Sequence, residues 1–184
     1  LKSLDGLKNV KYLSCDFNKL ITLDGLEKLT NLTYLWCHNN QLTSLEGLEK
    51  STKLMHLWCH YNKLTSLEGL DKLTNLTNLK CNKNFLTSLD GLDTLTNLTY
   101  LWCEYNKITS LDGLENLNNL IELRCNNNQI TSLDELENSK QLTNINFDNN
   151  LINHVPPNIK IVLDKLRSDY DEEDDDDDDD VHNY

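Results

Sequence analysis

The sequence predicts a β-rich solenoid of the α/β type, in which stacked repeats form an arc. A parallel β-sheet should line the concave face, and short 3₁₀ or irregular segments the convex face. The first observation is that six cysteines recur at an interval of 22 residues, from Cys15 to Cys125. The second is an asparagine three residues after each cysteine. Self-similarity at a fixed period of this size is typical of solenoids, in which each repeat packs only against its neighbours.

The first element of each repeat is predicted to be a short strand. Leu35 and Cys37 alternate with Trp36 and His38, and apolar residues alternate in the same way in the other repeats. A period of two indicates a strand with one buried face. Stacking places these strands side by side, which buries leucines that no single repeat could bury alone.

The second element is predicted to be a 3₁₀ or irregular convex segment. Leu42, Leu45 and Leu48 recur at every third position, and residues i and i+3 eclipse one another in a 3₁₀ turn. All six glycines fall at one place in these segments, which indicates a backbone angle that other residues resist. The asparagine row is expected to be structural, because a buried amide can satisfy backbone groups where the chain leaves the strand.

Both ends of the array depart from the repeat. Residues 3–7 read like a shortened convex segment, as expected of a terminal repeat. The pattern stops after Ile152, and the apolar side chains in residues 156–168 are expected to form a C-terminal cap over the open core. Residues 169–184, with ten consecutive carboxylates at 171–180, are expected to be a disordered acidic tail.

Seven segments, from residues 10–20 to 142–152, approximate the pattern L-x-x-L-x-C-x-x-N-x-L/I, which resembles the leucine-rich repeat signature. The repeat length and the convex leucine run are similar to internalin-like bacterial repeats and to nuclear phosphatase-regulator repeats. The resemblance implies a leucine-rich repeat solenoid over residues 1–155. Alanine is absent while Asn, Lys and Ile are plentiful, and this bias resembles leucine-rich repeat proteins of giant DNA viruses of amoebae.

The cysteines occupy leucine positions on the inward face, where a small buried hydrophobe fits. Neighbouring strands lie about 4.8 Å apart, so a disulfide between adjacent cysteines would require strain. A straight row also does not converge on a metal ion. We therefore expect free thiols, with disulfides and metal binding as less favoured alternatives. Free thiols favour a reducing compartment, and hence an intracellular, cytoplasmic location in the source cell or in a host.

Three columns of side chains should point away from the core, at the third, fifth and seventh places of each repeat. All three tryptophans fall in the fifth-place column, which favours a binding surface with aromatic anchors. The alternative is that the Leu-Trp-Cys segment was copied by repeat duplication, and that neighbouring Trp and Tyr rings only pack on one another across strands. The residues predicted to bind a partner are Tyr34, Trp36, His38, His56, Trp58, His60, Tyr61, Lys80, Tyr100, Trp102, Glu104, Glu122 and Arg124.

No motif predicts catalysis, a cofactor or a metal. The sequence has no glycine-rich phosphate loop and no recognisable nucleophile–histidine pair, and His38 and His60 would supply only half of a metal site. No apolar run approaches the ~18 residues of a membrane helix. Subtracting the ten charges of residues 171–180 from −13 leaves about −3, without a basic stripe, so nucleic acid is not expected as a partner.

The sequence thus predicts a monomeric, non-catalytic protein–protein interaction module whose partner it does not identify. Two alternatives stay open. One is a regulatory or adapter subunit of an enzyme such as a phosphatase. The other is a carbohydrate-binding surface that uses the tryptophan column.

Overall fold

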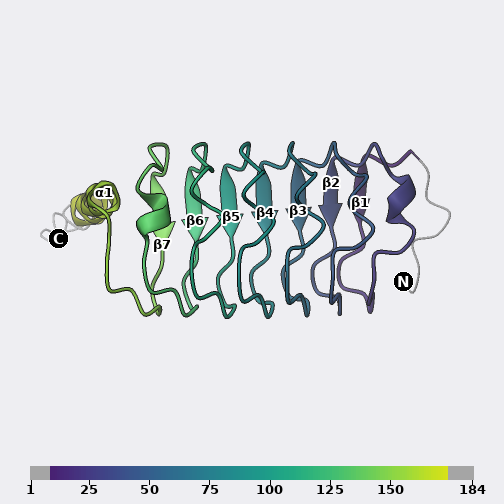
Figure 1. The fold of residues 1–184 in the computed structure, drawn as a ribbon, viewed down its shortest axis with the longest axis horizontal. Helices are drawn as coiled ribbons and strands as arrows, with labels where there is room; N and C mark the ends of the chain where they lie inside the picture. Colours follow the sequence, from purple (N-terminus) through teal and green to yellow (C-terminus); the bar gives the residue numbers. More distant parts are fainter. Residues whose placement is uncertain (1–8, 174–184) are drawn as a thin grey trace, which may run out of the picture.

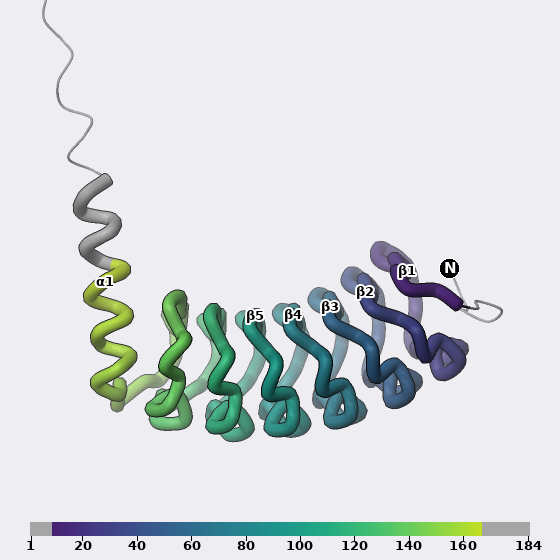
Figure 2. The backbone as a smooth tube through the Cα atoms, turned by 90° about the horizontal axis from the view of Figure 1, so that it is seen from above, coloured from purple at the N-terminus to yellow at the C-terminus, as the bar shows by residue number. Residues whose placement is uncertain are grey.

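The computed structural model describes the backbone of residues 9–173 and the side chains of residues 9–166. The predicted convex segment at residues 3–7 and most of the predicted acidic tail lie outside these residues. Figure 1 shows the strands side by side along the long axis of the molecule, and Figure 2 shows the arc with the strands along its inner curve. The predicted solenoid with a concave parallel sheet is confirmed.

The sheet has seven parallel strands in chain order. The strands are β1 (Tyr12–Ser14), β2 (Tyr34–Trp36), β3 (His56–Trp58), β4 (Asn78–Lys80), β5 (Tyr100–Trp102), β6 (Glu122–Arg124) and β7 (Asn144–Asn146). The register advances by one repeat per strand, so that Trp36 pairs with Trp58 and Trp58 with Lys80. Each column of the sequence is therefore a column in space.

The convex segments follow the predicted spacing of three. Leu73 N donates to Leu70 O, and Leu76 N donates to Leu73 O, both at 2.8 Å. Regular 3₁₀ turns form at η1 (Leu26–Lys28) and η2 (Asp134–Leu136), and similar bonds recur in the turns between them. Five glycines of these segments have φ between 94° and 99°. At Gly47 a Cβ would also lie 3.0 Å from the carbonyl oxygen of Leu23.

The core is one continuous strip of leucines with the cysteine row inside it. All six cysteines are buried and free, as the sequence predicts. Two thiols have hydrogen-bond acceptors on the next strand, with Cys59 Sγ 3.5 Å from Lys80 O and Cys103 Sγ 3.3 Å from Arg124 O. The row therefore fills the core without a disulfide.

The asparagine row links each repeat to the one before it. The Asn62 amide nitrogen donates to the carbonyls of Cys37 and Cys59, both at 3.0 Å, and its oxygen accepts from Leu42 N at 2.9 Å. The same pattern recurs at Asn40, Asn84, Asn106, Asn128 and Asn150. The asparagines are structural, because they satisfy backbone groups of two repeats at once.

Helix α1 (Pro157–Glu173) packs against β7 at the C-terminal end of the arc. Its Ile159 is fully buried, and the Asn158 amide donates to the carbonyl of Leu136 at 2.9 Å. The helix begins within the predicted cap and continues past residue 168. Within residues 9–173, no helix is both long and apolar enough to cross a bilayer.

Candidate binding surface on the concave sheet

The fifth-place column forms a stack of aromatic and cationic side chains. The rings of Trp36 and Trp58 lie 5.4 Å apart. The Lys80 ammonium lies over two rings, 4.3 Å from the centroid of Trp58 and 3.5 Å from that of Trp102. The Arg124 guanidinium also lies over the Trp102 ring, 4.0 Å from its centroid. This column, which we call the tryptophan stack, runs across five strands from β2 to β6.

Glu122 fixes one end of the tryptophan stack. Its Oε1 accepts a hydrogen bond from Trp102 Nε1 at 2.8 Å and another from Arg124 Nε at 2.6 Å. A carboxylate that accepts from both donors orders the ring and the guanidinium together. The sequence indicated that these residues are neighbours but not that one oxygen connects them.

The third-place column begins with a second stack of rings. Tyr34 lies 4.8 Å from Tyr12 and 4.3 Å from His56, measured between ring centroids. Tyr12 was absent from the predicted site, although it is 67% exposed and follows the same spacing. Tyr100 lies in the same column on β5, beyond Asn78.

The seventh-place column contains a stacked histidine pair. His38 and His60 lie 4.3 Å apart with nearly parallel rings, and Asp16 Oδ2 lies 3.5 Å from His38 Nε2. Burial, together with the charges of His38 and Lys80, lowers the pKa of His60 to about 4. Burial also lowers the pKa of His38, so both imidazoles are neutral at pH 7.

A row of buried polar atoms without a hydrogen-bond partner runs along the same column. These atoms are His38 Nδ1, His60 Nδ1, Asn82 Oδ1 and Glu104 Oε2. Burial also raises the pKa of Glu104. Because a buried polar atom without a hydrogen bond costs free energy, these four atoms reduce the stability of the seventh-place column.

The eighth place of each repeat contributes a further column that sequence reasoning mostly missed. Tyr61 was predicted, but the Lys83 ammonium lies over both Tyr61 and Tyr105, 4.4 and 5.1 Å from their centroids. All three residues have φ near +55°, which aims their side chains away from the strand direction. The recurrence of large residues one place after the seventh was the available signal.

The surface has the chemistry of a contact site. No group of three or more His, Cys, Asp or Glu within the described residues could hold a metal ion. Burial raises the pKa of Cys59 and Cys125 to about 12, so these thiols are not nucleophiles at neutral pH. The ordered rings and cations instead offer apolar area with fixed positive charges.

Comparisons with known proteins agree with this architecture. A family model that describes two copies of a leucine-rich repeat matches the chain three times, at residues 8–50, 52–94 and 74–116. No curated protein matches the chain.

Several solved structures are similar to the chain. Internalin InlF from Listeria monocytogenes is 28% identical with a TM-score of 0.78, over 85% of this chain and 46% of that one. A leucine-rich repeat protein of Leptospira interrogans is 30% identical with a TM-score of 0.80, over 86% of this chain and 43% of that one. The functional domain of InlJ from Listeria monocytogenes, described as including a cysteine ladder, is 36% identical with a TM-score of 0.60, over 79% of this chain and 36% of that one.

The chain thus spans less than half the length of these three proteins. The similarity supports the predicted resemblance to internalin-like repeats, whereas the resemblance to viral proteins stays a prediction. The family model covers more than half of the chain, and the register, the asparagine row and the leucine core follow its signature. The chain belongs to the leucine-rich repeat family.

Proposed function

We propose that the chain is a non-catalytic interaction module that binds a protein partner through the concave columns. The observation that carries this proposal is the tryptophan stack, which lies outside the leucine core. Tryptophan, tyrosine and arginine are enriched among the residues that dominate binding energy. Leucine-rich repeat folds of the internalin type generally mediate protein–protein interaction, which supports the same class of function.

The order of the surface supports the proposal. Each ring of the tryptophan stack packs against a side chain from an adjacent strand, and Glu122 accepts hydrogen bonds from both Trp102 and Arg124. Side chains that are already ordered lose little conformational entropy when a partner binds. The sheet beneath them has one register throughout, so the columns form a single rigid platform.

The charges of the surface indicate the partner's chemistry. Burial and the repulsion of Arg124 lower the pKa of Lys80, and attraction from Glu122 and Glu104 opposes them only in part. A carboxylate from a partner, placed near the Lys80 ammonium, would stabilise its positive charge further. We therefore expect the partner to present apolar side chains around at least one acidic residue.

Mutual packing is the competing explanation for the tryptophan stack. Cross-strand pairs of this kind contribute up to ~1 kcal/mol to sheet stability without any partner. The two explanations differ in what Trp58→Ala should change. A binding anchor would affect affinity, whereas a packing residue would affect unfolding.

The experiment begins with affinity purification on the immobilised chain to identify a partner, followed by titration with the purified partner. Trp58→Ala should weaken binding by ~2 kcal/mol or more, about thirtyfold, and leave unfolding nearly unchanged. Phe85→Ala is the matched control, because Phe85 is an exposed ring outside the concave columns. Unchanged affinity with reduced stability would assign Trp58 to packing.

The same purification distinguishes the alternatives. Recovery of a phosphatase would favour a regulatory or adapter subunit. Retention on a glycan array that is lost in the triple tryptophan-to-alanine variant would favour a carbohydrate surface on the tryptophan stack.

Four further expectations stay proposals. The cytoplasmic location rests on the free thiols alone. The lack of a nucleic-acid or membrane partner and a viral source rest on the sequence and its composition, and the monomeric state stays an expectation.

A further inference from the structure

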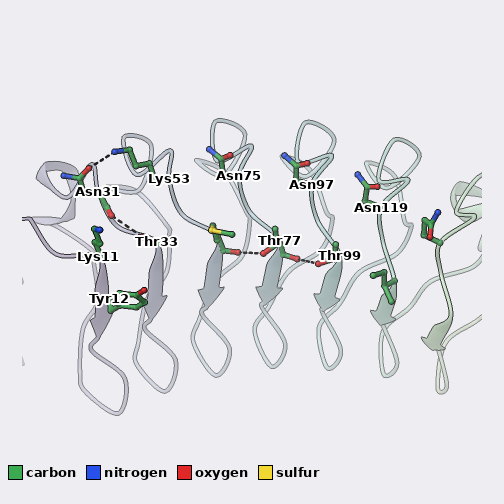
Figure 3. A pocket seen from close by; sticks show the side chains of 13 residues that line it. Lys11, Tyr12, Asn31, Thr33, Lys53, Asn75, Thr77, Asn97, Thr99 and Asn119 are labelled. Atoms are coloured by element: carbon green, nitrogen blue, oxygen red, sulfur yellow. Dashed lines mark hydrogen bonds between the residues drawn. The ribbon is translucent and has the colours of Figure 1, made fainter.

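A second surface runs along the edge of the sheet where the strands begin. It is an elongated groove of about 870 Å³, and Figure 3 shows its side chains following one another from repeat to repeat. The row nearer the strands consists of Lys11, Thr33, Met55, Thr77, Thr99 and Ile121, and the outer row of Asn31, Lys53, Asn75, Asn97, Asn119 and Gln141. Apart from Tyr12, which also lines it, the groove contains no residue of the concave columns named above.

The outer row presents fixed hydrogen-bond acceptors. The amide nitrogens of Asn75, Asn97 and Asn119 each donate to a carbonyl of the preceding repeat, at 2.7, 2.8 and 2.9 Å. This bond holds the side chain, while each amide oxygen keeps lone pairs for a ligand. The acceptors are thus ordered before anything binds, which reduces the entropy cost of binding.

The inner row adds acceptors of the same kind. The Thr99 hydroxyl donates to Thr77 O at 2.9 Å, and the Thr77 hydroxyl lies 3.1 Å from Met55 O. Since a hydroxyl has one proton and two lone pairs, these oxygens can still accept. The groove therefore matches a ligand that is rich in O–H donors.

The charge of the lining narrows the class of ligand. Among the described residues that line the groove there is no carboxylate, and the cations are Lys11 and Lys53, both near the N-terminal end. Nucleic acid would require a basic row along the whole path. The exposed Met55 and Ile121 add apolar contacts between the polar steps, which suits the faces of sugar rings.

The spacing of the rows selects among neutral polymers. One step along the groove is one strand spacing, about 4.8 Å, whereas an extended peptide advances ~3.4 Å per residue and would lose register. A β-1,4-linked hexose chain in its extended form advances by about 5 Å per sugar, which is close to one strand spacing. We propose that this groove binds an extended, neutral, β-linked polysaccharide that lies along the solenoid axis with one sugar per repeat.

Calorimetric titration of the full chain with β-1,4-linked gluco-, manno- and N-acetylglucosamine oligomers of two, four and six sugars tests the proposal. At least one hexamer should bind with a Kd below ~1 mM, and affinity should rise up to about six sugars, one for each residue of the inner row. The double variant Thr77→Val/Thr99→Val removes two acceptors while keeping the branched shape, and should bind about tenfold more weakly. The double variant Thr65→Val/Thr87→Val, which changes exposed threonines outside the groove, should bind normally.

Three results would overturn the proposal. The first is no binding of any hexamer at millimolar concentration, and the second is equal binding by the two double variants. The third is loss of binding in the triple variant Trp36→Ala/Trp58→Ala/Trp102→Ala, which would move the sugar to the tryptophan stack. Because the groove and the tryptophan stack are different surfaces, the result of the sugar titration does not depend on whether a protein partner binds the concave columns.

Discussion

Replacing Asn84 by alanine is expected to destabilise the solenoid by ~1–3 kcal/mol. The Asn84 amide nitrogen donates to the carbonyls of Cys59 and Cys81, at 3.1 and 2.9 Å, and its oxygen accepts from Leu64 N at 3.0 Å. Alanine deprives these three buried backbone groups of that partner. Cys59 O keeps a second donor in Asn62 Nδ2 and Cys81 O keeps one in Asn106 Nδ2. The main loss is therefore the acceptor of Leu64 N, and one unsatisfied buried group costs ~1–3 kcal/mol.

Two other substitutions at the same position test the reasoning further. Asn84→Cys should cost less than alanine, because the leucine-rich repeat signature accepts cysteine at this place and a thiol is a weak donor and acceptor. Asn84→Asp should cost at least as much, because a carboxylate would face two carbonyl oxygens. Asn118→Ala is the control, since Asn118 is exposed and lies outside the row.

Urea unfolding followed by circular dichroism measures these differences. The urea concentration at the unfolding midpoint should be highest for the wild type, lower for Asn84→Cys and lowest for Asn84→Ala. The slope of the free energy of unfolding against urea should stay constant, which distinguishes a change in stability from a change in the unfolded state. If Asn84→Ala stayed within ~0.5 kcal/mol of the wild type, as surface substitutions do, the structural account of the asparagine row would be wrong.

The six buried thiols should react slowly with a thiol reagent in the native chain and completely after unfolding, and a disulfide found by mass spectrometry in the native chain would contradict the hydrophobic row. Stability should decline as the pH falls from about 6.5 towards 4, because the pKa of His60 is about 4 in the folded chain and the unfolded chain binds the proton first. That contribution is fully present above pH 6.5, and His60→Asn should flatten the pH dependence of the unfolding midpoint; an identical profile for both chains would refute it. Gly47→Ala should cost more than ~1 kcal/mol, because φ is +99° and the added Cβ would meet Leu23 O at 3.0 Å. Gly69→Ala should cost less, since the nearest atom is 3.6 Å away, and equal losses of thermal stability would exclude the steric part of this explanation.

The fold and the columns were predictable because one period determines both. A fixed interval of 22 residues sets the strand register, and the register then places Trp36 beside Trp58 without any knowledge of the chain between them. The role of the asparagine row was predictable for a related reason. An invariant amide beside an inward strand position has few uses other than satisfying backbone groups.

The parts that were missed depend on backbone angles and on side-chain orientation. Lys83 and Tyr105 join the surface because the chain takes a left-handed turn at the eighth place, with φ of 54° and 57°. The hydrogen bonds of Glu122 require particular rotamers, which a periodic pattern does not specify. The groove at the strand starts depends on where the chain bends into the sheet, and threonine and asparagine at loop positions are too common to indicate it.

The single register of the sheet creates a recognition problem that the composition of the columns resolves. A surface generated by translation along one axis looks nearly the same after a shift of one repeat, so a partner could dock in several offset positions of similar energy. Lys80 falls between Trp58 and Trp102, and Arg124 follows Trp102, so an offset of one strand exchanges rings for cations. Such a mismatch penalises the shifted poses. For the proposed interaction, the interruption of the aromatic row would therefore give a bound partner a single position along the arc.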